Sequence, residues 1–276
     1  MRIATLIMAH EAPEQLRSLA ERMLREDAGD RVIVHLDAKS ALWADGWGDV
    51  LRELTKIEVV PRPVAVRWGH VSQVAAIRVL LRAALAGPCD LLHLVSGLDW
   101  PVASRDEIAA RAADAECFIE AVPHLQSERM DAFRLDARWL RPNPDNFGAW
   151  HAAQALRRLS SLVPRRRSHP WGPWHKGSTW WSLPRDVAEV VFCELDAALR
   201  NHRLVGTVCA DEHVIPTIVA SRFASRIASN RRFIRWQPGA ASPAVLGADD
   251  CAKARASGAW FARKLSLADD PFFLAY

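Results

Sequence analysis

The sequence has few of the residues that build disulfide frameworks, structural zinc sites or membrane spans. Its 276 residues include five widely spaced cysteines and no Cys-x-x-Cys pair, so we interpret these cysteines as reduced thiols of a cytoplasmic protein. The apolar run at the N-terminus stops at His10, too early for a signal peptide. No stretch reaches the roughly 20 apolar residues of a membrane helix. We expect a soluble protein, with peripheral membrane contact left open.

Motifs that mark several enzyme classes are also missing. The chain has no GxGxxG, GxxxxGK, GxSxG or HExxH sequence, so the common signatures for dinucleotides, P-loop phosphates, serine nucleophiles and zinc are absent. It also has no Asp-x-Asp pair, which many sugar transferases use to hold a metal and a diphosphate. Clustered His and Asp ligands are lacking as well, which disfavours a metal-dependent phosphate-ester hydrolase.

The charge balance is weakly basic, with 36 Lys and Arg residues against 32 Asp and Glu. A net charge of +4 is too small for a dedicated nucleic-acid binder, although a pI near 9.0 suits a small anionic substrate. Twelve tryptophans stand against one tyrosine. A tryptophan ring offers a flat apolar face to the C–H groups of a sugar, but ordinary packing in the core is the alternative for each one.

Strand and helix patterns alternate through the first 120 residues. Short buried strands separated by helices predict an α/β fold with a mostly parallel central sheet, helices on both faces, and ligands at the carboxyl ends of the strands. A Ser-x-x-Glu capping box at Ser104 predicts the start of one helix. The expected strands are Arg2–Met8, Arg31–Leu36, Ile57–Val60, Leu91–Val95 and Cys117–Ala121, and the expected helices are Ala12–Arg25, Ser40–Leu54, His70–Ala86 and Ser104–Ala115.

The segment from Pro123 to His175 breaks this alternation. It contains Arg-Pro-Asn-Pro at 141–144 and a basic run at 165–167, and we expect an inserted binding loop with a helix near Ala149–Leu162. The basic run predicts a solvated face, with phosphate contact as the alternative. No linker is visible, so we expect one domain. The later elements expected are strands Thr179–Leu183 and Phe233–Trp236 and helices Pro184–Leu199, after Asp211, and Asp249–Ser257.

Six short motifs follow one another in a distinctive order. They are His35-Leu-Asp-Ala-Lys39, Arg67-Trp-Gly69, Ser96-Gly-Leu-Asp-Trp-Pro101, Lys176-Gly-Ser-Thr-Trp-Trp-Ser-Leu183, Asp211-Glu212 and Phe261-Ala-Arg-Lys264. From Ile3 to about Leu265, this set resembles glycosyltransferase family 14, which comprises the core-2/I-branching β-1,6-N-acetylglucosaminyltransferases and the peptide O-xylosyltransferases.

The resemblance implies a GT-A fold and an inverting, metal-independent transfer from a UDP-sugar, with no cofactor. N-acetylglucosamine or xylose would pass to a hydroxyl of a glycan, glycolipid or peptide. Residues 1–121 would form the nucleotide-sugar-binding half, 122–175 the acceptor region, and 176–276 the catalytic and diphosphate-binding half of a single domain. A bacterial enzyme of polysaccharide biosynthesis fits the analogy.

The resemblance also assigns residues to the donor. Asp37 would contact the nucleoside, with capping of the next helix as the alternative, and His35 is expected in the core. Asp99 would hold a donor hydroxyl, while Arg67 either lines the donor pocket with Trp68 or caps the sheet edge. The donor-binding residues expected are Ala9, His10, Asp37, Arg67, Trp68, Asp99, Arg263 and Lys264.

Cations are expected to replace the metal at the leaving diphosphate. Family members use a lysine at the position of Lys264 together with an upstream arginine. That arginine has no clear match near Ser242–Val245. Arg263 is therefore the first candidate for its role, and the alternatives are Arg231, Arg232 and Arg235.

Glu212 is the catalytic residue that the resemblance predicts. Inversion needs a base to take the proton from the attacking hydroxyl, and the Asp-Glu motif places Glu212 in that role. Asp211 would be its neighbour and the helix N-cap; the alternative is that both acids only complement the helix dipole. Acceptor contacts are expected from Glu120, Arg129 (or Arg134), Trp180, Trp181 and Trp236, with Lys176, Gly177 and Ser178 shaping the wall.

A different class of function is also compatible with these motifs. A non-catalytic carbohydrate- or nucleotide-binding protein could keep the fold and lose turnover. Glu212 discriminates between the two, because a binding protein has little reason to keep a base beside an intact Lys264.

Overall fold

The computed structural model describes residues 1–24, 29–53, 57–134, 147–162, 169–240 and 242–267. A seven-stranded sheet lies at its centre, with the strand order β10-β6-β9-β4-β1-β2-β3. Only β9 runs antiparallel to its neighbours, so the predicted mostly parallel α/β sheet is confirmed. The strands are β1 (Ile3–Ala9), β2 (Arg31–Leu36), β3 (Ile57–Val59), β4 (Leu91–Ser96), β6 (Cys117–Phe118), β9 (Trp181–Pro184) and β10 (Ile227–Ala228).

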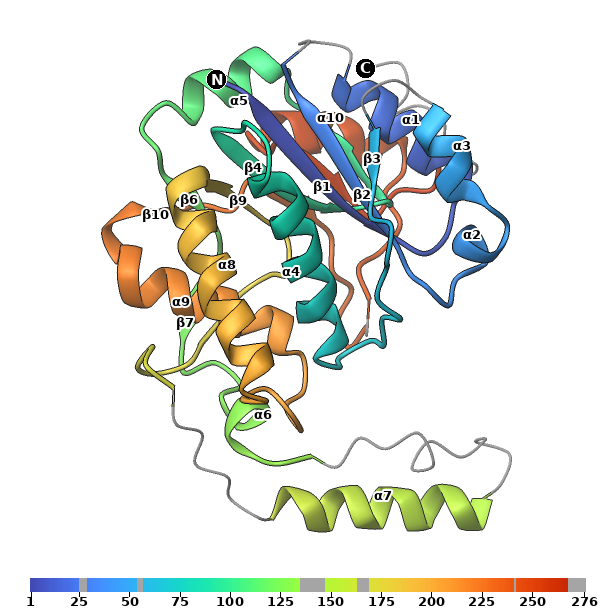
Figure 1. Ribbon diagram of the computed structural model, residues 1–276, viewed down its shortest axis with the longest axis vertical. Helices are drawn as coiled ribbons and strands as arrows, with labels where there is room; N and C mark the ends of the chain where they lie inside the picture. The colour runs from blue at the N-terminus through green and yellow to red at the C-terminus, as the bar shows by residue number, and fades with distance from the viewer. Residues whose placement is uncertain (25–28, 54–56, 135–146, 163–168, 241, 268–276) are drawn as a thin grey trace.

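Side chains alternate between two apolar layers on the two faces of the sheet, as the period of a strand requires. In β1, Ala4 and Leu6 join one buried cluster, whereas Ile3 and Ile7 join the other. Helices α4 (Ser72–Leu85), α8 (Arg185–Arg200) and α9 (Val214–Phe223) cover the first face, and α4 and α8 lie in front of the sheet in Figure 1. Helices α1 (Pro13–Leu24) and α10 (Ala248–Ala256) pack on the second. The helices on both faces complete the α/β architecture that the sequence predicts.

A second, three-stranded sheet has the order β11-β12-β5. It joins β5 (Asp99–Pro101), which follows β4, to β11 (Arg232–Ile234) and β12 (Phe261–Arg263). The β5–β12 pair is antiparallel, with Asp99 opposite Arg263 and Pro101 opposite Phe261. This small sheet therefore brings the last described strand beside the loop that follows β4.

Most sequence-based boundaries agree with the structure to within two residues, and the Ser104 capping box is present at α5 (Arg105–Arg111). Three elements differ by more. The helix expected over Ser104–Ala115 ends four residues early, at Arg111. The helix expected over Ser40–Leu54 is split into α2 (Ala41–Ala44) and α3 (Trp47–Glu53), because Gly46 at φ +78° turns the chain between them. The strand expected over Cys117–Ala121 is shorter in the structure. Only Cys117 and Phe118 pair with the neighbouring strand, and residues 119–121 lead to β7 (Val122–Pro123).

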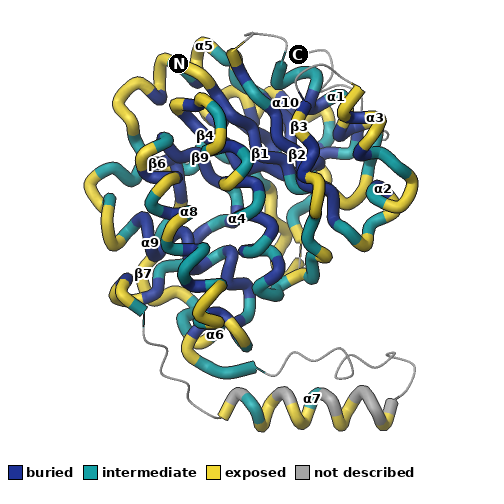
Figure 2. The backbone as a smooth tube through the Cα atoms, viewed as in Figure 1, coloured by how far each residue is buried: buried dark blue, intermediate teal, exposed yellow. Residues whose placement is uncertain are grey.

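The middle of the chain leaves the central layers. After α6 (Glu128–Asp131), α7 (Phe147–Ser161) lies apart from the sheet in Figure 1, and several of its residues are coloured as exposed in Figure 2. The chain then returns through β8 (His175–Lys176), which pairs with β7. The Arg-Pro-Asn-Pro stretch and the basic run at 165–167 lie outside the described residues. No helix in the described part of the chain is long and apolar enough to cross a membrane.

Candidate active site

Glu212 lies between two cations that approach from separate segments. It belongs to a 3₁₀ turn, η2 (Ala210–Glu212), which precedes α9. Its Oε2 atom is 3.3 Å from Nη1 of Arg129 on α6 and 3.4 Å from Nζ of Lys176 on β8. No hydrogen bond from the described residues reaches the other carboxylate oxygen, Oε1, and the side chain is 29% exposed. The turn thus presents Oε1 of Glu212 to solvent, while Oε2 of the same carboxylate is held by Arg129 and Lys176.

The backbone around Glu212 is packed closely. The amide of Gly177 donates a hydrogen bond to the carbonyl of Glu212 over 2.8 Å. A Cβ atom at Gly177 would collide with the carbonyl oxygen of Glu120, so only glycine fits at this position. Val208 N also bonds to the carbonyl of Arg129 at 3.0 Å. These contacts fix the segments that carry Glu212, Lys176 and Arg129 to one another.

Asp211 faces the protein interior, beneath Glu212. Its Oδ2 accepts hydrogen bonds from Thr179 Oγ1 at 2.7 Å and Gln73 Nε2 at 3.3 Å. The expected role as helix N-cap is wrong, because this carboxylate caps no backbone amide and is 3% exposed. Gln73 in turn accepts a bond from Gly69 N, so Asp211 ties the Arg67–Gly69 motif to the turn of Glu212. Burial raises the pKa of Asp211 to about 6.

Replacing Asp211 with Asn is expected to change how stability depends on pH. Because the carboxyl titrates near pH 6 when folded and near 3.8 when unfolded, the folded state binds more protons between these values. The wild-type protein should therefore lose about 2 kcal/mol of unfolding free energy from pH 4 to 6.5, relative to Asp211→Asn. Urea unfolding of both proteins across this range measures the difference. Two curves that stay parallel would contradict the burial of an ionisable Asp211.

A second group of charges lies on the small sheet. Oδ1 of Asp99 is 2.7 Å from Nη1 of Arg263, and Oδ2 accepts a bond from Ser96 N at 2.9 Å. The guanidinium of Arg263 lies over the ring of Trp180, 4.5 Å from its centroid. Asp99 is fully buried, so the expectation that it holds a donor hydroxyl is corrected: it positions Arg263 instead. Since Thr179 contacts Asp211, residues 179–180 connect this group to the Glu212 turn.

Lys264 follows β12 directly and lines a groove of about 560 Å³ with Glu11, Gln15 and Leu98. Its Nζ is 3.9 Å from Oε1 of Glu11, a long and partly exposed ion pair. Gln15 Nε2 donates to the carbonyls of Gly97 and Leu265, which locks the segment after Lys264 against the loop after β4. The groove therefore places an ammonium group beside the carboxyl ends of β1 and β4.

The motif at the end of β2 is built as a turn. Oδ1 of Asp37 accepts bonds from the amides of Lys39 and Val66, at 3.1 and 3.0 Å, while Ser40 caps the next helix. The helix-cap alternative for Asp37 is therefore wrong, and its nucleoside contact stays a prediction. Asp37 N bonds to the carbonyl of Ala9, which joins the ends of β1 and β2. His35 is buried as expected, and desolvation lowers its pKa to about 4.

Other expected donor residues surround these strand ends. His10 is exposed and 3.5 Å from Glu11. The side chain of Arg67 contacts His70 within its own turn, so the alternative of a sheet-edge cap is wrong. Trp68 is 76% exposed. Donor contacts by Ala9, His10, Arg67 and Trp68 remain predictions.

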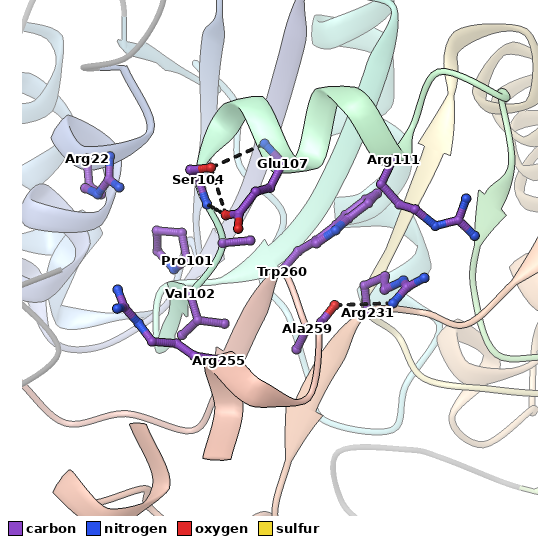
Figure 3. Close-up of a pocket in the computed structure, with 12 residues that line it drawn as sticks. Arg22, Pro101, Val102, Ser104, Glu107, Arg111, Arg231, Arg255, Ala259 and Trp260 are labelled. Atoms are coloured by element: carbon purple, nitrogen blue, oxygen red, sulfur yellow. Dashed lines mark hydrogen bonds between the residues drawn. The ribbon is translucent and has the colours of Figure 1, made fainter. Parts of the chain in front are cut away.

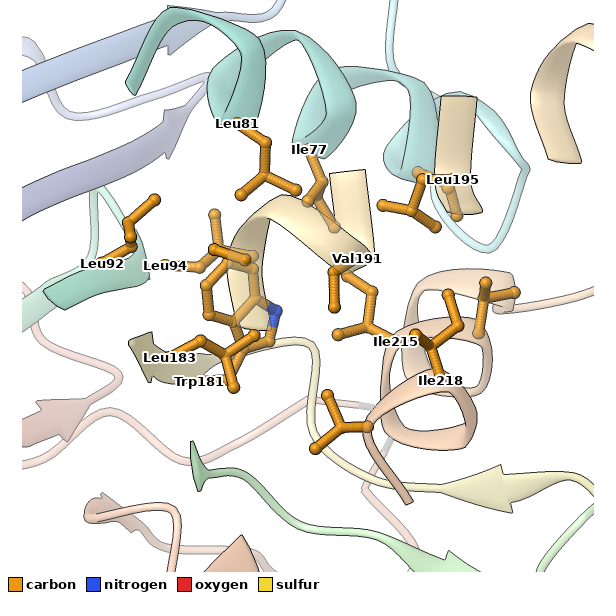
Figure 4. Close-up of a cluster of buried hydrophobic side chains, with 14 of the residues drawn as sticks. Ile77, Leu81, Leu92, Leu94, Trp181, Leu183, Val191, Leu195, Ile215 and Ile218 are labelled. Atoms are coloured by element: carbon orange, nitrogen blue, oxygen red, sulfur yellow. The ribbon is translucent and has the colours of Figure 1, made fainter. Parts of the chain in front are cut away.

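The three tryptophans expected at the acceptor differ in their surroundings. Trp181 is fully buried among Leu94, Leu183 and the α4 and α8 side chains, as Figure 4 shows, so its expected contact with a sugar is corrected to a core role. One face of the half-buried Trp180 is covered by Arg263. Trp236 is 58% exposed after β11. Glu120 is exposed beside Gly177, and acceptor contacts by Glu120, Arg129, Trp180 and Trp236 stay predictions.

Three arginines that were alternatives to Arg263 have other partners. Arg232 is half-buried beside β9, where its Nη2 donates to the carbonyl of Trp181 at 2.8 Å and to Ser182 Oγ at 3.0 Å. Desolvation lowers its pKa to about 10. Arg235 pairs with Asp250 at 3.1 Å, and Arg231 contacts the carbonyl of Gly258. Reasoning from the sequence did not find Arg232 as a structural cation, nor Arg129 and Lys176 as partners of Glu212.

Comparison with known proteins assigns the chain to a family. The model of the core-2/I-branching enzyme family matches residues 3–255, nearly all of the described fold. The chain belongs to this family. The core-2/I-branching enzymes are glycosyltransferases, and the matched range contains five of the six motifs, while Phe261–Lys264 lies beyond its end. No curated protein is similar enough to count as a match.

Several solved structures are distantly similar to this core-2/I-branching enzyme. WbbM, a bifunctional glycosyltransferase solved without ligand, is 12% identical with a TM-score of 0.41; the alignment covers 95% of this chain and 45% of WbbM. The Q189E active-site mutant of LgtC is 11% identical with a TM-score of 0.41, covering 96% and 87% of the two chains. HddC from Yersinia pseudotuberculosis, complexed with GMP-PN, is 11% identical with a TM-score of 0.33, covering 67% and 78%.

The described part of this family member contains no group of three or more His, Cys, Asp or Glu side chains arranged to hold a metal ion. The carboxylate that follows β4, Asp99, is already occupied by Arg263 and the Ser96 amide. A divalent ion at this point would have to displace an arginine. The charged groups that remain exposed near the strand ends include Lys264, which suits a diphosphate.

Proposed function

We propose that this core-2/I-branching enzyme moves N-acetylglucosamine or xylose from a UDP-sugar to a hydroxyl of a glycan, glycolipid or peptide, with inversion and without a metal. The observation that carries the proposal is the Glu212 carboxylate, whose Oε2 is held by Arg129 and Lys176 while Oε1 is available. One positioned carboxylate is what a single displacement requires of a base.

In the proposed reaction, Glu212 acts on the acceptor and not on the donor. Its Oε1 takes the proton of the acceptor hydroxyl as the oxygen attacks the anomeric carbon of the sugar. The bond from that carbon to the UDP oxygen breaks on the opposite face, which inverts the configuration. Arg129 and Lys176 keep the carboxylate in position, and Arg129 lies where an acceptor hydroxyl or carboxylate could also bind.

The donor side of the proposal rests on Lys264. As the glycosidic bond breaks, negative charge grows on the diphosphate, and an ammonium fixed at the strand ends stabilises it more in the transition state than in the bound donor. Arg263 is held by Asp99 and Trp180 with its side chain 16% exposed, so we propose that it contributes mainly through the field of its charge.

A thermal-shift screen of nucleotides tests the donor. UDP is expected to raise the melting temperature, with a stabilisation of about 2.7 kcal/mol at 100 times its dissociation constant. GDP and dTDP serve as matched controls with the same diphosphate, and smaller shifts are expected for both. Equal shifts for all three would show that only the diphosphate is recognised, and no shift with any of them would contradict a nucleotide-sugar donor.

Transfer is expected to continue in saturating EDTA. The reason is that Lys264 and Arg263 supply positive charge where metal-dependent enzymes place an Asp-x-Asp motif, while Asp99 is buried in an ion pair. Product formation is measured with EDTA, with added manganese, and with neither. Activity that returns only when manganese is added would overturn the metal-free mechanism.

A further inference from the structure

A pocket of about 470 Å³ lies on the small sheet, away from Glu212 (Figure 3). Its walls come from four parts of the chain that are distant in sequence: α1, the β5–α5 segment, the turn before β11, and the end of α10 with the residues that follow it. Trp260, only 3% exposed, forms part of the wall. The cavity is large enough for a small organic anion.

The lining of this pocket is mainly basic. Four arginines line it, one from each of those parts, and one acid, Glu107, accompanies them. One of the four, Arg111, also pairs with Glu116 outside the lining, at 2.9 Å. Glu107 is committed to the capping box, because Oε2 accepts bonds from the amide and hydroxyl of Ser104 at 2.7 and 2.8 Å. These bonds lower the pKa of Glu107 and keep it ionised. The arginines are Arg22, Arg111, Arg231 and Arg255.

Arg231 supplies an independent sign that a ligand is accommodated here. Its backbone has φ +54°, a left-handed conformation unusual for a residue with a side chain, and Figure 3 shows its side chain beside Ala259. Nη1 makes a long 3.4 Å contact to the carbonyl of Gly258, and Nε is enclosed with no partner among the described residues. This guanidinium is therefore poorly satisfied, and an anion in the pocket would accept a hydrogen bond from its outer nitrogen, Nη2.

The pocket and the candidate active site occupy opposite ends of the same strand pair. Asp99 and Arg263 lie opposite each other at one end of β5 and β12, and Pro101 and Phe261 at the other. Pro101 lines the arginine pocket, whereas Lys264 lines the groove beyond Arg263. The lining residues of the two cavities do not overlap.

We propose that the arginine pocket is a second anion-binding site, which takes a small molecule or headgroup bearing a phosphate or diphosphate. Guanidinium groups pair with phosphate oxygens through two parallel hydrogen bonds, and several of them around one cavity favour a doubly charged group over a single carboxylate. The proposal is independent of the donor assignment, since none of the residues in this pocket takes part in the proposed transfer.

Inorganic pyrophosphate, titrated calorimetrically into the full chain with UDP saturating, tests the site. The double variant Arg231→Gln/Arg255→Gln is expected to weaken pyrophosphate binding by about tenfold or more, because each lost guanidinium removes a charge-assisted hydrogen bond. The matched control is Arg200→Gln on α8, a 73% exposed arginine paired with Asp196, which should bind pyrophosphate like the wild type. The UDP-dependent thermal shift should be unchanged in both variants.

Further arms separate the possible outcomes. Arg255→Glu is a single exchange at an exposed position of α10, and it should also abolish binding if the double variant proves unstable. Vesicles of phosphatidylcholine with and without phosphatidic acid distinguish a lipid headgroup from a soluble phosphate as the source. Pyrophosphate affinity that is the same in the wild type and in the pocket variants would overturn the proposal. An equal loss in Arg200→Gln would show that only general surface charge is sensed, and would overturn it as well.

Discussion

Glu212→Gln is expected to lower turnover by about 10²–10⁴-fold, while UDP affinity stays near the wild-type value. The amide keeps the size of the side chain but cannot accept the proton of the attacking hydroxyl. The substitution also removes the negative charge between Arg129 and Lys176, yet all three side chains are partly exposed, so the melting temperature should change little. Steady-state kinetics with a UDP titration on each protein separates the two effects.

The control for this variant is Glu189→Gln on α8, another partly exposed glutamate in an ion pair with an arginine. It should retain full turnover. Near-normal turnover in Glu212→Gln would move the base to another residue. Glu120 is then the next candidate, because it is an exposed carboxylate beside Gly177, whereas Asp99 is fully buried. If neither variant nor wild type shows transfer while UDP still binds, the non-catalytic binding protein becomes the better description.

Lys264→Ala is expected to weaken UDP binding and slow transfer together, each by about tenfold or more. The ammonium would contact the diphosphate both in the bound donor and as charge develops in the transition state, and charge-assisted hydrogen bonds are worth roughly 1.5–3 kcal/mol. Its pairing with Glu11 spans 3.9 Å, so little native stabilisation is lost and the melting temperature should hold. Calorimetric UDP titration and kinetics provide the two measurements.

Two variants place this result in context. Lys253→Ala on α10 is the matched lysine control and should leave UDP affinity unchanged. Arg263→Ala is expected to lower the melting temperature as well as activity, because it strands the buried carboxylate of Asp99 without its counter-charge. UDP affinity in Lys264→Ala equal to that of the wild type would assign the diphosphate to another cation.

The fold could be predicted from the sequence where local pattern decides it. The strands from β1 to β4 are short apolar runs between helical patterns, and the capping box marks the start of α5, so these elements fall close to their expected bounds. The sequence did not predict the break between α2 and α3. Gly46 turns the chain there in a left-handed conformation, but the spacing of apolar residues on either side still looks helical. The significance of the ordered motifs came from the resemblance to a known family, because periodicity alone predicts only the helices and strands.

The candidate site was less predictable because its contacts cross large separations in the chain. Arg129 and Glu212 are 83 positions apart, and no local pattern indicates that they meet. Trp180 and Trp181 are adjacent and chemically identical, yet only Trp181 enters the strand and points into the core. A one-residue difference in position therefore places the ring of Trp181 in the core and leaves that of Trp180 half-buried, and acceptor contact by Trp180 stays a prediction.

The pairing of β5 with β12 has a consequence for how the chain acquires its active conformation. Asp99 is made early during synthesis, but Arg263, its counter-charge, lies 164 positions later. During synthesis on the ribosome, β5 therefore lacks its partner strand β12 and Asp99 lacks its counter-charge. Both are missing until nearly the last described residue has emerged. Such non-local closure slows folding and leaves apolar edges open to other chains. Premature termination before residue 261 should accordingly yield a chain that needs chaperones, rather than a shorter enzyme with reduced activity.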